Sequence, residues 1–186
     1  MHRTSPSSRL VLALHGLVLL GAGPAGAMGP VDVPPTWGGD PSSRSRLTGD
    51  WGGSRDELGK KGVVLDVDLV LAPQTVMSGG KDTGTVAWGN ATYTLNVDTG
   101  KAGWWPGGFF NVKGDSSFGN DGYGEIGAFV PASTAILVPD TLEPGSGLES
   151  ATFTQFLSPK FGLLMCKIHT LDLVHGEFNV NYQTQF

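Results

Sequence analysis

The sequence predicts an all-β chain whose antiparallel strands cross a membrane as part of a β-barrel. The first observation is the strict alternation of residues 63–71, where five apolar residues share one parity and two aspartates the other: Val63, Leu65, Val67, Leu69 and Leu71, against Asp66 and Asp68. Successive side chains of a strand point to opposite faces, so this strand has one apolar and one acidic face. The second is its length of about 10 residues, which a tilted strand needs to cross a bilayer. The third is composition, because 29 glycines among 186 residues, with five tryptophans and nine phenylalanines, suit a β chain with many turns.

The first 27 residues are predicted to be a secretory signal peptide. Arg3 and Arg9 lie in a polar, basic lead, and residues 10–20 form a short apolar core. Ala25 and Ala27 follow in the small-residue pattern that signal peptidase cleaves, so we expect cleavage after Ala27. The core is too short for a spanning helix, which needs about 20 apolar residues.

Charge and cysteine content exclude two classes of protein. Residues 1–27 hold two of the 12 basic side chains and none of the 17 acidic ones, so the exported chain has a formal charge of −7. An acidic chain does not suit nucleic-acid binding, which favours basic patches. The single cysteine, Cys166, excludes an intramolecular disulfide scaffold.

The exported chain is predicted to contain a leader, one short helix and then several strands joined by loops and turns. Residues 28–46 are rich in Pro, Gly and Ser and are predicted to be a flexible leader. Residues 47–61 hold one short helix, for which Asp50 is the expected N-cap and Gly62 the expected stop. Strands are predicted over residues 62–72, 86–98, 108–115, 148–157 and 161–169, and residues 128–147 are expected to be a long loop with a short strand or a helical turn. The connections alternate between long and short, which is typical of outer-membrane barrels.

One block and three later stretches resemble a known family. Residues 47–66 read LTGDWGG, then Arg55, Leu58, Lys61-Gly62 and VVLD. Asn96-Val-Asp98 leads into GWWPGG at residues 103–108, followed by AFVP at residues 128–131 and by QFLS, KFGLL and Lys167-Ile168 between residues 155 and 168. In this order they resemble the carbohydrate-selective porins, the OprB family. Cys166 stands where that family usually has glycine.

The resemblance implies a passive channel for small sugars in the outer membrane of a Gram-negative-type bacterium. Its partners would be small carbohydrates and outer-membrane lipid, with no enzymatic activity and no cofactor, and it leaves open whether copies form a homo-oligomer. Family members close a barrel of 16 strands, whereas this chain offers about five or six. The resemblance therefore implies the N-terminal part of such a porin, residues 47–186, and a chain that does not conduct alone.

Polar residues on the predicted strands are the candidate groups facing the lumen. They share the parity opposite to the apolar face: Asp66, Asp68, Thr92, Thr94, Asn96, Lys113 and Lys167. A charge buried in lipid costs about 2–4 kcal/mol at mid-membrane, so in a barrel these residues should point inward. Trp104 and Trp105, at a short turn, are candidate aromatics of the membrane interface.

Two further motifs are not predicted to be functional sites. His169 and His175, near Asp172 and Glu177, match no established ligand spacing, so no metal site is predicted. The Asn90-Ala-Thr sequon lies within a predicted strand and is attributed to chance.

Two alternatives to the porin fragment stay open: a soluble exported β-sandwich that binds glycans with its tryptophans, and a complete small barrel.

Overall fold

The computed structural model describes residues 15–20, 30–79, 81–120 and 144–167 as one antiparallel sheet and one short helix. The strands are β1 (His15–Leu20), β2 (Val63–Val76), β3 (Gly84–Asp98), β4 (Gly108–Gly119), β5 (Gly145–Ser158) and β6 (Phe161–Lys167), and the helix is α1 (Ser54–Lys60). The predicted all-β class with a short N-terminal helix is confirmed. The predicted loop over residues 128–147 lies outside the described residues except at its end, where residues 145–147 belong to β5.

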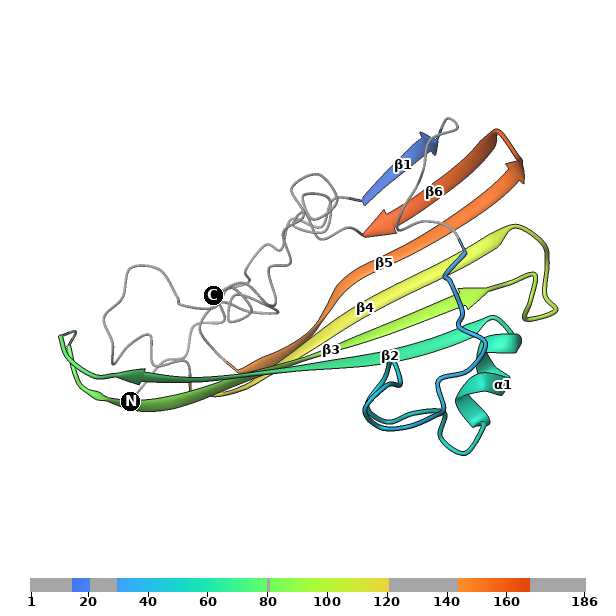
Figure 1. Cartoon of the computed structure of the whole chain (residues 1–186). Helices are drawn as coiled ribbons and strands as arrows, with labels where there is room; N and C mark the ends of the chain where they lie inside the picture. The colour runs from blue at the N-terminus through green and yellow to red at the C-terminus, as the bar shows by residue number, and fades with distance from the viewer. Residues whose placement is uncertain (1–14, 21–29, 80, 121–143, 168–186) are drawn as a thin grey trace, which may run out of the picture.

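The sheet is an open meander with the order β1-β6-β5-β4-β3-β2 (Figure 1). All neighbouring strands are antiparallel. The edges are β1 and β2, so closure into a barrel remains a proposal. β1 lies within the predicted signal peptide and pairs through its backbone with β6 from Gly162 to Lys167; cleavage after Ala27 likewise remains a prediction.

Several strands are longer than the sequence pattern predicts. β2 has 14 residues, β3 has 15 and β5 has 14. β2 continues through Pro73, where a loop was expected, and Pro73 lies opposite Ala87. Proline removes a ladder donor, and an edge strand such as β2 tolerates this because one of its sides has no strand partner among the described residues.

α1 begins later than predicted. Asp50 is not its N-cap: Gly53 is, with a φ of 90° and no capping side chain. Trp51 and Gly52 also have positive φ values, 56° and 68°, so a left-handed stretch precedes the helix. Since a helix needs negative φ, it cannot start before Ser54. The predicted end is confirmed, because Gly62 has a φ of 76° and follows directly after Lys61.

One irregularity changes which side chains share a face. Lys113 pairs with Ser150, but Gly114 pairs with Leu148, so Glu149 is an extra residue in β5. This is a β-bulge, a feature that redirects a side chain.

Candidate functional site

Polar side chains from three strands lie on one face of the sheet. The register aligns Asp66 with Thr94 and Lys113, and Asp68 with Thr92 and Asp115. One step nearer the β3–β4 turn, Asn111 Nδ2 donates to Asn96 Oδ1 at 2.6 Å. We call this surface the polar face: Asp66, Asp68, Thr92, Thr94, Asn96, Asn111, Lys113 and Asp115. Six of the seven residues predicted to face a lumen therefore share one side of the sheet.

Lys167 is the exception, and its predicted place on the polar face is wrong. It pairs with Ala151, on the same side as Phe153 and Met165, two residues that pair with each other. Its Nζ donates to the carbonyl oxygen of Leu148, next to the bulge, at 2.6 Å. Leu148 itself pairs with Gly114, and the Lys167 ammonium group donates to its carbonyl beside the extra residue Glu149.

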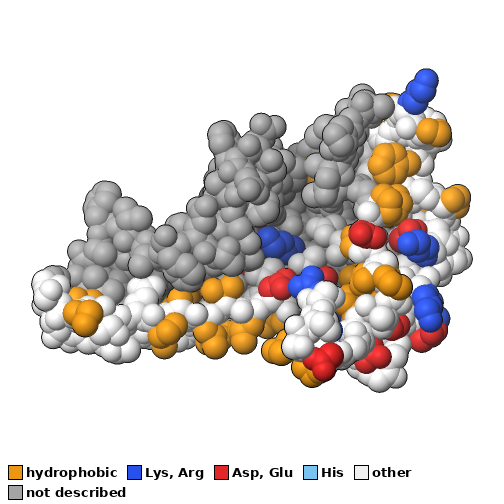
Figure 2. All heavy atoms as spheres, in the orientation of Figure 1, with side chains coloured by type: hydrophobic (Ala, Val, Ile, Leu, Met, Phe, Trp, Pro, Cys, Tyr) orange, Lys and Arg blue, Asp and Glu red, His pale blue; other side chains and the backbone are white. Residues whose placement is uncertain are grey.

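The opposite side of the sheet is apolar and exposed to a degree unusual for a water-soluble domain. Val67, Leu69 and Leu71 of β2 are 55%, 60% and 62% exposed. The register continues this surface across β3, β4, β5 and β6. We call it the apolar face: Leu65, Val67, Leu69, Leu71, Tyr93, Leu95, Val112, Phe153 and Met165. Figure 2 shows hydrophobic side chains along the underside of the sheet, with charged side chains gathered toward the end that carries α1.

Asp66 and Asp68 are paired with arginines of the N-terminal segment. Arg46 places Nε 3.0 Å from Asp66 Oδ1 and Nη1 3.0 Å from Asp68 Oδ1. Arg55 donates through Nη2 to the carboxylate of Asp66 and, at 3.1 Å, to the carbonyl of Leu65. Two guanidinium groups thus balance the two carboxylates that the sequence suggested as groups facing a lumen.

Arg55 is held in an aromatic cage. Its guanidinium carbon lies 4.9 Å from the ring centroid of Trp37 and 5.1 Å from that of Trp51. Cation–π attraction of this kind strengthens when the charge is removed from water, and Arg55 is buried. Gly59 makes the cage possible, since a Cβ there would lie 2.6 Å from a ring carbon of Trp37.

The Asp50-Trp-Gly-Gly-Ser-Arg55 motif now has a structural explanation. The left-handed turn at residues 51–53 places Trp51 beside the side chain of Arg55. The carbonyl of Asp50 accepts both the Gly53 and the Arg55 amides, at 3.1 and 2.9 Å. The motif therefore builds the aromatic cage and directs Arg55 toward β2.

A buried charged cluster, missed by sequence reasoning, lies on β4 and β5. Thr92 Oγ1 donates to Asp115 Oδ1 at 2.5 Å, and Lys113 Nζ lies 3.1 Å from Glu149 Oε2. Asp115 and Glu149 are both buried, so this cluster removes two carboxyl groups from water on neighbouring strands. The sequence could have placed Asp115 on this face, because Asp115 and Lys113 are two residues apart in the same strand. No sequence pattern could have placed Glu149 there, since only the bulge brings it to this face.

The two predicted interface aromatics lie in the β3–β4 turn and are exposed. Their rings stack with centroids 6.0 Å apart. Trp105 Nε1 donates to Gln155 Oε1 at 2.7 Å, and its ring meets Phe110 and Phe153 edge-on. An amphipathic ring with a satisfied N–H suits a boundary between apolar and aqueous surroundings.

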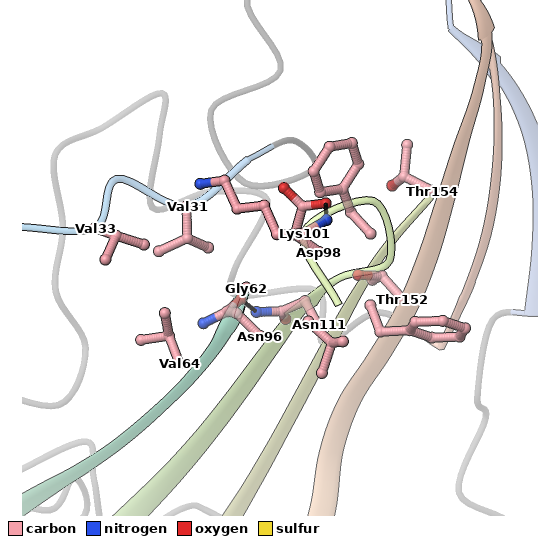
Figure 3. Close-up of a pocket in the computed structure, with 13 residues that line it drawn as sticks. Val31, Val33, Gly62, Val64, Asn96, Asp98, Lys101, Asn111, Thr152 and Thr154 are labelled. Atoms are coloured by element: carbon pink, nitrogen blue, oxygen red, sulfur yellow. Dashed lines mark hydrogen bonds between the residues drawn. The ribbon is translucent and has the colours of Figure 1, made fainter. Parts of the chain in front are cut away.

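A pocket lies between the N-terminal segment and the polar face (Figure 3). Val31 and Val33 form one wall, and Asn96, Asn111 and Thr152 are among the groups on the other. Its cavity volume is about 20 Å³, which is room for about one water molecule and too small for a sugar ring.

We expect the contact between Asp56 of α1 and the preceding segment to weaken in acid. Thr36 Oγ1 and the Trp37 amide donate to the Asp56 carboxylate at 2.6 and 3.0 Å, and these bonds hold the pKa of Asp56 below its ordinary value of 3.8. A lowered pKa gives a stabilisation that is present above the ordinary value and lost as pH falls through the folded-state pKa. Tryptophan fluorescence should therefore report a transition below about pH 3.8. Asp56→Asn should abolish this transition, and an unchanged one would assign it to another group.

The described residues offer neither a cluster of metal ligands nor a membrane-spanning helix. The described residues contain no group of three or more His, Cys, Asp and Glu side chains that could hold a metal ion. Within those same ranges, no helix has the length and hydrophobicity needed to span a membrane. His169 and His175, for which no metal site was predicted, lie outside the described residues. In comparisons with known proteins, the chain matches no protein-family model, no curated protein and no solved structure.

Proposed function

We propose that this chain is part of an outer-membrane channel through which small carbohydrates diffuse passively. The observation that carries the proposal is the apolar face, which extends over five strands and leaves large side chains uncovered in the described structure. Contiguous exposed apolar surface of this kind marks a membrane or protein contact. β2 to β5 are 12 to 15 residues long, which exceeds the 9–11 or so that a tilted strand needs to cross the hydrocarbon.

The chemistry of the polar face supports a carbohydrate as the solute. Half of its eight residues carry an amide or a hydroxyl, namely Asn96, Asn111, Thr92 and Thr94, and such groups suit the hydroxyl groups of a sugar. The nearest arginines and carboxylates neutralise one another, so no strong single-sign charge would select ions there. The sequence resemblance to carbohydrate-selective porins points to the same solute. No chemical step and no cofactor form part of the proposal.

The open edges support a larger barrel than the described strands provide. β2 and β1 each have one strand neighbour among the described residues. Hydrocarbon does not tolerate unpaired backbone groups, so the channel needs further strands to close. We therefore expect the 186-residue chain alone to form no channels in a planar bilayer.

The decisive experiment is cell fractionation, followed by conductance. The chain expressed with its leader in a Gram-negative host should enter the outer-membrane fraction and require detergent for extraction. Recovery as a soluble periplasmic protein would contradict the proposal and favour the glycan-binding β-sandwich. Single channels from the purified chain would support transport but contradict the expected need for further strands.

A further inference from the structure

The N-terminal segment that covers one end of the polar face is attached at two points of very different character. We call residues 30–61 the strap. One attachment is Arg55, whose side chain is 4% exposed within its aromatic cage. The other is Arg46, whose side chain is 38% exposed and whose second partner, Asp68, is 53% exposed. Solvent weakens the second attachment and not the first.

The stretch of the strap that carries Arg46 has few other contacts. Among residues 39–48 all are exposed except Arg44 and Arg46, which are half-buried, while Trp37 before them and Gly49 after them are buried. The hydrogen bonds within this stretch are local, such as those from the Ser43 and Arg44 amides to the Asp40 carbonyl, both 3.0 Å. A turn with local bonds and little burial can move as a unit.

Glycines with positive φ values lie at both ends of this stretch. Gly39 has a φ of 110° and Gly49 one of 65°. A Cβ at Gly39 would meet nothing, so space does not restrain that end. Backbone rotation at these two positions is the simplest route by which residues 40–48 could leave the sheet.

We propose that residues 39–49 form a hinged flap over the polar face, held closed by Arg46, while Arg55 keeps the rest of the strap in place. On release, Asp66 keeps Arg55 as its partner, but Asp68 loses Arg46. This part of the polar face then gains one uncompensated negative charge. The flap is a property of this chain and does not depend on whether the sheet lies in a membrane.

Chymotrypsin cleavage after Leu47 tests the flap in the folded chain. Leu47 is 84% exposed, but a protease needs several residues around the bond to detach from the sheet. Raising NaCl from about 0.05 to about 0.5 M screens exposed ion pairs, so cleavage should accelerate severalfold. Asp68→Asn removes a partner of Arg46 without changing the flap's sequence, and it should raise the low-salt rate by about two- to fivefold and flatten the salt response.

The matched control is Asp82→Asn, which makes the same change of charge at an exposed aspartate in the β2–β3 loop. It should keep the wild-type rate and salt response. Cleavage after Leu58, within α1, reports detachment of the whole strap and should not change in either variant. The proposal is overturned if Asp68→Asn cleaves after Leu47 like wild type, if the wild-type rate ignores salt, or if both bonds accelerate together.

Discussion

Replacing Arg55 with alanine is expected to lower the free energy of unfolding by about 3–5 kcal/mol. The substitution leaves the Asp66 carboxylate without its most buried partner and empties the space between Trp37 and Trp51. It also removes the donor to the Leu65 carbonyl on the edge strand. Urea unfolding followed by tryptophan fluorescence would measure the loss, because two of the five tryptophans form the cage.

Two further variants separate the parts of this effect. Arg55→Lys keeps the charge but loses the planar group that stacks between two rings, so its stability should lie between those of wild type and Arg55→Ala. Arg44→Ala removes another arginine of the same segment, one with no ion pair to β2 within the described structure, and should cost no more than about 1 kcal/mol. Equal stabilities of the Arg44→Ala and Arg55→Ala chains would show that the cage does not stabilise the fold.

Replacing Leu69 with arginine is expected to weaken association with lipid vesicles by about 2–4 kcal/mol. Leu69 lies within β2 on the apolar face, flanked by Val67 and Leu71. If this face contacts hydrocarbon, the guanidinium must be desolvated there. In water the same substitution replaces an exposed leucine and should change stability by less than about 0.5 kcal/mol.

The neighbouring Val70→Arg variant is the matched control. It introduces the same side chain one residue along the strand, opposite Asn90 and so on the side of the polar face. Its vesicle binding, measured by flotation, should stay within about 1 kcal/mol of wild type, because the polar face does not contact lipid in the proposed channel. Equal binding of the Leu69→Arg and wild-type chains would contradict the membrane-facing role of the apolar face.

The alternation of residue types predicted the strands β2 to β6 and the two faces of β2, β3 and β4. Period-two alternation is a local property, so residues 63–71 specified both sides of β2 without any knowledge of its neighbours. The short connections at residues 99–107 and 159–160 indicated which strands are adjacent. Strand ends were misjudged, as at Pro73, because the edge position that tolerates proline is a property of the assembled sheet.

The partners of the polar residues were not predictable in this way. Arg46 and Asp68 are 22 residues apart in sequence, and Arg55 and Asp66 are 11 apart. Their pairing depends on how the left-handed turn at residues 51–53 directs the segment onto β2. Glu149 was missed and Lys167 was misplaced for a related reason. A single bulge decides which face Glu149 joins and which carbonyl Lys167 contacts.

The sequence by itself determined an antiparallel sheet with one polar and one apolar face, because side-chain direction in a strand follows from position alone. Only the tertiary structure decided that Asp66 and Asp68 hold the N-terminal strap and that Lys113 forms an ion pair with Glu149. Those outcomes depend on distances between segments remote in sequence, and an ion pair or a shared hydrogen bond exists only when folding brings its two groups within about 3 Å.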